Sequence, residues 1–170
     1  MSNSDGLSKE IHQLQQVLWV GIGCKRETSW QLIDLAIEQV FRENQLFPSA
    51  IAGIATIDTK ASEIGLIELC NRRNLPLKTF SAQILRSVCV PNPATITDDK
   101  VGTPSVAEAA AILAATQTPL LSAYAFTSTE ALRVKFLVSK QIFQIQGQLG
   151  AVTLAVAQAS NISITISQFF

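Results

Sequence analysis

The chain has few of the residues on which metal-dependent and histidine-dependent enzymes rely, because its 170 residues include three cysteines and one histidine. Cys24, Cys70 and Cys89 follow neither a C-x-x-C nor another metal-ligand spacing, so we expect free thiols, no metal site and no disulfide. The single histidine, His12, stands in a polar N-terminal stretch. We therefore expect no Cys–His or Ser–His–Asp catalytic set.

A net charge and a long apolar run are also missing. The 13 basic and 13 acidic residues give a formal net charge of zero, so no global field attracts nucleic acid or an anionic membrane, and any anion selectivity must be local. No apolar stretch approaches the roughly 18 residues that a membrane-spanning helix needs. The N-terminus lacks the basic start and apolar core of a secretory signal. We expect a cytoplasmic protein with no nucleic-acid and no membrane partner.

The composition favours a folded protein, since 48% of the residues are hydrophobic and 15% are charged. The length is that of one domain. We expect a flexible arm at 1–16, one α/β domain at 17–158, and a C-terminal tail at 159–170. The tail alternates polar and apolar residues, and the sequence leaves open whether it forms an edge strand, a packing contact or a disordered end.

The hydrophobic pattern predicts a three-layer α/β/α fold in which helices follow the first strands. Near the C-terminus, β-rich runs at 133–145 and 150–157 predict a hairpin, which makes the sheet mixed. The other predicted strands are 17–22, Ile51–Ile57, Leu77–Phe80 and a short run within 95–101. The predicted helices are 28–44, 61–73, a short helix after Ser81, and a helix that opens at Thr103-Pro104 and runs to Ala115.

Three short polar turns, at 21–28, 56–63 and 101–108, each connect a strand-like run to a predicted helix. In α/β proteins such turns place helix N-termini at one edge of the sheet, where free backbone N–H groups and the helix dipole attract anions. These turns are therefore the candidate site.

The first turn combines glycines with cations. Gly21 and Gly23 allow a sharp turn or a close approach of a ligand, and Lys25 and Arg26 could clamp an anion at the start of the helix. The alternative is a tight turn with solvated cations. A dinucleotide fingerprint is disfavoured because the third glycine is missing. Cys24 could be a reactive thiolate beside these cations, although a buried, inert thiol is favoured.

The second turn contains the cluster of side chains best suited to catalysis, Asp58, Lys60 and Glu63. Lys60 could bind an anion or polarise a carbonyl, and Glu63, expected one turn into the helix, could orient Lys60 or act as a general base. The alternative is that Asp58 or Thr59 caps the helix while Lys60 and Glu63 pair on its surface.

Further candidate ligand contacts are hydroxyl residues and one acid within or beside the three turns. Ser105 and Glu108 have the spacing of a capping box, and that explanation is sufficient for Glu108. The hydroxyls of Thr103 and Ser105 could still contact a ligand. Thr28 and Thr56 complete the set. Trp19 and Trp30 are expected to pack in the core or at its edge.

The three turns together resemble the signature of the C-terminal domain of the CbiG/CobE family of cobalamin biosynthesis. The matching segments are GIGCKRET, ATIDTKASEIGLIELC and GTPSVAEAAAILAA, with LPLKTFSAQIL between the second and the third. The resemblance covers residues 17–157. Two features depart from the family pattern: Glu27 stands where a small residue is common, and 127–148 is longer and more β-rich.

The resemblance implies a function in building the corrin ring. Full-length CbiG proteins open the ring-A lactone of cobalt-precorrin-5A with release of acetaldehyde, whereas CobE-type proteins consist of little more than this domain. This chain resembles the short kind, and we expect it to act without the family's usual N-terminal portion. It would bind or act on a cobalt-precorrin intermediate, with Lys60 at the developing oxyanion and Glu63 or Asp58 as base.

The remaining expectations follow from the same resemblance. Any cobalt would belong to the substrate, and no cofactor of the protein's own is expected. Other cobalamin-biosynthesis proteins are candidate partners, and a homo-oligomer is left open. Two other classes of function also stay open: a non-catalytic corrinoid-binding or complex-forming module, and a nucleotide-binding α/β domain.

Overall fold

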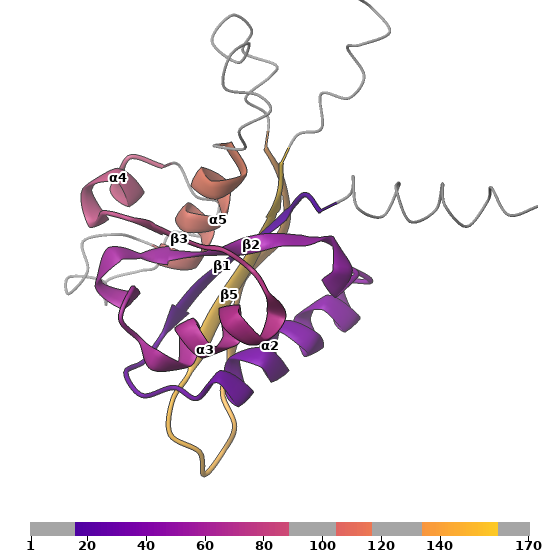
Figure 1. The fold of residues 1–170 in the computed structure, drawn as a ribbon. Coiled ribbons are helices and arrows are strands. Elements are labelled where there is room, and N and C mark those ends of the chain that lie inside the picture. Colours follow the sequence, from indigo (N-terminus) through magenta and orange to yellow (C-terminus); the bar gives the residue numbers. More distant parts are fainter. Residues whose placement is uncertain (1–15, 89–104, 117–133, 160–170) are drawn as a thin grey trace, which may run out of the picture.

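The structure, a computed structural model, describes residues 16–88, 105–116 and 134–159. Five strands form one sheet in the order β3-β2-β1-β5-β4 (Figure 1). The strands are β1 (Leu18–Cys24), β2 (Ile51–Ile57), β3 (Leu77–Phe80), β4 (Lys135–Phe143) and β5 (Val152–Gln158), and the α-helices are α2 (Trp30–Glu43), α3 (Ile64–Arg73), α4 (Ala82–Arg86) and α5 (Val106–Thr116).

The sheet is mixed, as predicted. β1, β2 and β3 are parallel to one another, whereas β5 pairs antiparallel with β1 and β4 pairs antiparallel with β5. The predicted C-terminal hairpin is therefore confirmed. Helices α2 and α3 cover one face of the sheet, and α4 and α5 lie on the other, which gives the three layers expected from the sequence (Figure 1).

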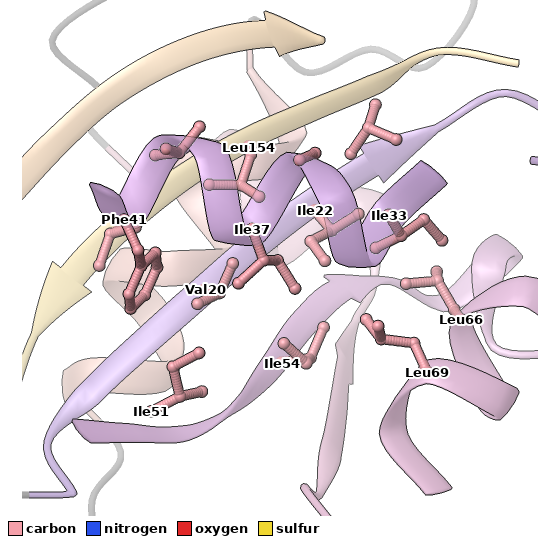
Figure 2. Packing of buried hydrophobic residues seen from close by; sticks show 14 of the residues in the cluster. Val20, Ile22, Ile33, Ile37, Phe41, Ile51, Ile54, Leu66, Leu69 and Leu154 are labelled. Atoms are coloured by element: carbon pink, nitrogen blue, oxygen red, sulfur yellow. The ribbon is translucent and has the colours of Figure 1, made fainter. Parts of the chain in front are cut away.

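The face under α2 and α3 is packed with large aliphatic side chains. Ile33, Ile37 and Phe41 recur along α2 at helical spacing and pack over Val20 and Ile22 of β1, as Figure 2 shows. All five side chains are fully buried. At about 25 cal/mol per Å² of buried apolar area, this cluster is the main hydrophobic stabilisation of the domain.

The core on the opposite face is rich in alanine, although it also includes Trp19, Phe80 and Leu85. Helix α5 buries six alanines and lies so close to β1 that a Cβ at Gly21 would be 1.8 Å from the carbonyl oxygen of Ala107. Small side chains on the helix and a glycine on the strand are both needed for this approach. The contact places the first turns of α5 beside the carboxyl-terminal half of β1.

Two helix starts differ from the prediction. Helix α2 begins at Trp30 and not at 28, and it is capped by Ser29, whose hydroxyl accepts a hydrogen bond from the Leu32 N–H at 3.2 Å. Helix α3 begins at Ile64 and not at 61, because Asp58–Lys60 forms a 3-10 turn and Glu63 is still extended. Neither Asp58 nor Thr59 caps α3.

Other predictions for the described residues are confirmed. β2 and β3 have the predicted bounds, and Ser81 caps the short helix α4 through a hydrogen bond from Ile84. Trp19 is buried, with its ring under Lys78, and Trp30 stacks with Arg72 at 4.0 Å. The strand-like run within 95–101, most of the arm at 1–16 and nearly all of the tail at 159–170 lie outside the described residues.

Candidate functional site

The carboxyl ends of β1 and β2 bring the first two turns together at one edge of the sheet. The side chain of Glu63 connects them, because its Oε2 accepts a hydrogen bond from the backbone N–H of Glu27 at 3.4 Å. Glu27 has a positive φ of 64°, which turns this N–H toward the second loop. Glu27 therefore contributes its backbone N–H to the connection between the two turns.

The first turn is held by its backbone and by Thr28. The Lys25 N–H donates to the carbonyl oxygen of Ala151, just before β5, at 3.1 Å, and the Thr28 hydroxyl donates to the Lys25 carbonyl at 2.7 Å. Thr28 is only 2% exposed. It therefore stabilises the turn instead of facing a ligand.

Lys25 and Arg26 are exposed at this turn, directly before the start of α2. Neither forms an ion pair with any residue that the structure describes. Two cations close in sequence to the positive end of a 14-residue helix are an arrangement that attracts anions. Both predicted cations are thus at the surface, and their binding role stays a prediction.

The second turn has its charges paired. The Lys60 Nζ lies 3.5 Å from Glu63 Oε1, and the two side chains are 20% and 18% exposed. Asp58 is exposed at the start of the 3-10 turn. Glu63 is the residue before α3, and the prediction that it lies one turn into the helix is wrong. Both Glu63 oxygens have a partner.

Cys24 lies beside this pair. Burial raises the pKa of the Cys24 thiol to about 11; the nearby Lys60 opposes that rise and Glu63 adds to it. A thiol with such a pKa is almost entirely protonated at neutral pH, which favours an inert residue over a reactive thiolate.

Two predicted contacts have structural roles instead. Thr56 is fully buried, and its hydroxyl donates to the Ile22 carbonyl at 2.6 Å, so it connects β1 and β2 inside the sheet. Gly21 is covered by α5. Gly23, two residues farther along the same face of β1, is open: the nearest atom to a Cβ there would be the Thr153 Cβ, at 3.8 Å.

The third turn is described from Ser105 onward, and Thr103 lies outside the described residues. The Ser105 hydroxyl accepts from the Glu108 N–H at 3.4 Å, which is one half of the predicted capping box. The other half is absent, because both carboxylate oxygens of Glu108 are buried and have no hydrogen-bond partner among the described residues. Glu108 is 0% exposed. A capping box therefore does not account for this side chain.

An apolar surface adjoins the second turn. Ile64, the first residue of α3, is 77% exposed, and with Ile67 it borders a shallow hollow that also includes Glu68, Asn71 and Arg72. The edge thus combines exposed cations with an exposed aliphatic platform. Sequence reasoning did not single out this platform, although the Ile-Gly-Leu-Ile run after Glu63 carried the signal.

Comparison with known proteins identifies the family. The family model described as "Cobalamin synthesis G C-terminus" matches residues 18–157. The chain belongs to this family. The match spans all five strands, so the CbiG-type domain accounts for the whole described fold.

Two cobalt-precorrin-5A hydrolases resemble parts of the chain. The protein from Priestia megaterium is 32% identical over 98 residues, which are 58% of this chain and 26% of that protein. The protein from Salmonella typhimurium is 36% identical over 66 residues, which are 39% of this chain and 19% of that protein. The aligned parts thus span about a quarter of the length of these curated relatives or less.

A solved structure shares the fold of the CbiG-type domain. CobE, described as a protein from the cobalamin (vitamin B12) biosynthetic pathway, has a TM-score of 0.68 and 23% identity over 85% of this chain and 95% of its own. The chain is thus a cobalamin-biosynthesis family member that resembles part of cobalt-precorrin-5A hydrolase.

Two kinds of feature are absent from the described residues of the CbiG-type domain. They contain no group of three His, Cys, Asp or Glu side chains that could hold a metal ion. None of the described helices is long and apolar enough to cross a membrane.

Sequence reasoning missed one part of the edge, the end of the β4–β5 loop. Ala151 accepts the Lys25 N–H, and the preceding Gly150 has a φ of 106°, which only glycine adopts readily. A Cβ at Gly150 would lie 2.7 Å from the Thr28 hydroxyl oxygen. The glycine in the loop was the available signal, but its partner was 122 residues away in sequence.

Proposed function

We propose that the chain binds a cobalt-precorrin-type corrinoid intermediate at this edge and takes part in opening its lactone. The observation that carries the proposal is the pair of exposed cations Lys25 and Arg26 before α2, which have no ion-pair partner among the described residues. The next residue, Glu27, is hydrogen-bonded to Glu63, the partner of Lys60. A corrinoid intermediate carries several acetate and propionate carboxylates around a largely apolar ring. Charge-assisted hydrogen bonds from Lys and Arg suit those carboxylates.

The apolar platform supports the same ligand. Ile64 is exposed immediately after Glu63, so a ligand whose carboxylates reach the cations could rest apolar atoms on Ile64 and Ile67. A small inorganic anion would leave that aliphatic surface uncovered. The combination therefore favours a large ligand that is both apolar and multiply anionic.

A nucleotide fits the first turn less well. A phosphate loop needs backbone N–H groups that point freely at the phosphate. Here the Lys25 N–H donates to Ala151 and the Glu27 N–H donates to Glu63, so two N–H groups of the turn are already occupied. The anion at this turn is therefore held mainly by side-chain cations.

A non-catalytic corrinoid-binding or complex-forming module is the second candidate, and one observation favours it. Both oxygens of Glu63 are engaged, one with Lys60 and one with the Glu27 N–H, so Glu63 is poorly placed to take a proton. Asp58 is exposed on a 3-10 turn, where water surrounds its carboxylate. The predicted base is thus the weakest part of the catalytic hypothesis.

Calorimetric titration of the purified chain tests the binding proposal. We expect cobalt-precorrin-5A or a stable polycarboxylate corrinoid to bind, with affinity that falls as salt screens Lys25, Arg26 and Lys60. ATP and NAD serve as comparison ligands. Tight nucleotide binding without corrinoid binding would contradict the proposal, and release of acetaldehyde on incubation with cobalt-precorrin-5A would separate the catalytic candidate from the binding module.

A further inference from the structure

The side chain that neither the fold nor the Lys60–Glu63 pair explains is Glu108. It is fully buried, and both of its oxygens lack a hydrogen-bond partner among the described residues. Burying a carboxylate without a partner costs several kcal/mol, so such a group is usually retained for a ligand or a reaction. Its backbone N–H is already bonded to Ser105, which leaves the carboxylate itself without a structural partner.

Glu108 lies in the first turn of α5, and helix geometry directs its carboxyl group toward the N-terminus of the helix. In an α-helix the Cα–Cβ bond tilts toward the N-terminus, so a long side chain covers the preceding turn. The N–H groups of Val106 and Ala107 start the same helix and have no acceptor among the described residues. Within the described residues, this helix end thus presents two backbone donors and a carboxylate acceptor that have no partner.

The strand beside this helix end leaves room for a ligand. Helix α5 contacts β1 at Gly21, where Ala107 and Ala111 lie against the strand. Gly23 is two residues farther toward the carboxyl end of β1, about 6.6 Å on, and it is partly exposed with no close neighbour at its Cβ position. A ligand group could approach the start of α5 over Gly23.

We propose that Glu108 is the general base of the lactone opening and that the reacting carbonyl lies at the start of α5, not between Lys60 and Glu63. This inference rests on the proposed function, since it assigns the chemistry of that same site. Lys25, Arg26 and Lys60 then bind peripheral carboxylates of the substrate.

The reaction needs no co-reactant other than water. Glu108 takes a proton from a water molecule as the water oxygen forms a bond to the lactone acyl carbon. The carbonyl electrons move to its oxygen, and the N–H groups of Val106 and Ala107 face the resulting oxyanion. The bond from the acyl carbon to the ring oxygen then breaks, and the leaving alkoxide takes the proton back from Glu108. The products of this step are a carboxylic acid, which ionises, and a hydroxyl group. Acetaldehyde leaves in a later step, in which the hydroxyl group loses its proton and the bond between its carbon and the macrocycle breaks, with the electron pair left on the macrocycle.

Glu108→Gln tests the assignment against Glu63→Gln, which makes the same chemical change in the other turn. Purified full chain in excess over cobalt-precorrin-5A is followed in a single turnover by acetaldehyde release, and corrinoid affinity is measured by absorbance titration. We expect both variants to keep their affinity. We expect Glu108→Gln to slow turnover by about 10²–10⁴-fold, the usual contribution of a general base, and Glu63→Gln, which keeps an oxygen that can accept from the Glu27 N–H, to slow it far less.

Two further variants distinguish chemistry from folding. Glu108→Asp should keep measurable turnover, and added formate should restore part of the rate lost in Glu108→Ala, because a small carboxylate can enter the space left by the side chain. A side chain with a purely structural role would not be rescued by formate. Melting curves confirm that each variant is folded.

The possible failures are separable. Turnover by Glu108→Gln at the wild-type rate, or a loss confined to Glu63→Gln, overturns the assignment of Glu108. Wild type that binds the corrinoid but releases no acetaldehyde also overturns it and leaves the binding module in place. Wild type that binds no corrinoid rejects the proposed function itself, and this inference with it.

Discussion

The Lys60–Glu63 turn and the Ser105–Glu108 turn contain the same kind of acidic residue at the start of a helix, yet their environments are opposite. Glu63 is partly exposed and both of its oxygens are engaged, by Lys60 and by the Glu27 N–H. Glu108 is fully buried and neither of its oxygens is engaged by a described residue. An acid with satisfied partners is most simply a structural connector, whereas a buried acid without partners points to chemistry.

The two turns also differ in how they are supported. The Lys60–Glu63 turn lies on the aliphatic side of the sheet, where an ion pair between Arg73 and both Asp34, at 2.6 Å, and Glu38, at 2.7 Å, holds α3 against α2. The Ser105–Glu108 turn depends on the direct contact of α5 with Gly21. A mutation that weakens only one of these two contacts should therefore affect one turn more than the other.

The largest effect should come from Gly21→Ala. The new Cβ would meet the backbone of Ala107 and Ala111, which cannot rotate away as a flexible side chain could, so α5 must move. We expect a loss of about 3 kcal/mol in the free energy of unfolding, at the upper end of typical overpacking effects. Urea unfolding followed by circular dichroism measures it.

Gly23→Ala is the matched control, because Gly23 lies on the same face of β1 without a close neighbour. We expect it to change the unfolding free energy by no more than about 1 kcal/mol, in the stabilising direction. Equal losses for the two variants would show that the approach of α5 to Gly21 is not what positions the third turn.

The next effect concerns ligand affinity. Arg26→Ala should weaken corrinoid binding by about 1.5–3 kcal/mol if the guanidinium makes a charge-assisted hydrogen bond to a substrate carboxylate. The melting temperature should hardly change, since Arg26 is exposed and has no ion-pair partner among the described residues. Arg42→Ala, exposed in the last turn of α2 and so at the other end of that helix, is a control of the same chemistry. An unchanged affinity for Arg26→Ala would remove the first turn from the site.

Much of this arrangement could be read from the sequence because it is set locally. The bounds of β2 and β3, the cap at Ser81 and the hairpin follow from hydrophobic period and turn residues near each element. The starts of α2 and α3 were harder to predict from the sequence. They depend on the 3-10 turn at Asp58–Lys60 and on the left-handed Glu27, which involve contacts between separate loops. The same holds for the site. The exposed cations of the first turn could be predicted from the sequence. The different environments of Glu63 and Glu108 could not, because residue spacing does not show which side chain is buried or hydrogen-bonded.

A smaller effect, on the free energy of unfolding, should distinguish Glu108 from Glu63. Glu108→Gln removes a buried carboxylate that has no described partner, so we expect the free energy of unfolding to stay constant or to rise by about 1 kcal/mol. The measurement is urea unfolding at neutral pH. A loss of about 3 kcal/mol or more would mean that Glu108 has a strong structural partner, and the contrast between the two turns would then disappear.

The smallest effect should be that of Glu63→Gln on stability. The amide keeps one oxygen that can accept from the Glu27 N–H, and the change removes mainly the Coulomb attraction across the 3.5 Å pair with Lys60. Partly exposed ion pairs of this kind contribute about 0–1 kcal/mol, so we expect a loss of a few tenths of a kcal/mol. This loss should shrink in high salt, because salt screens a partly exposed pair. Salt-independent destabilisation would instead assign the contribution of Glu63 to its hydrogen bond with the first turn, and the connection between the two loops would then matter more than the ion pair.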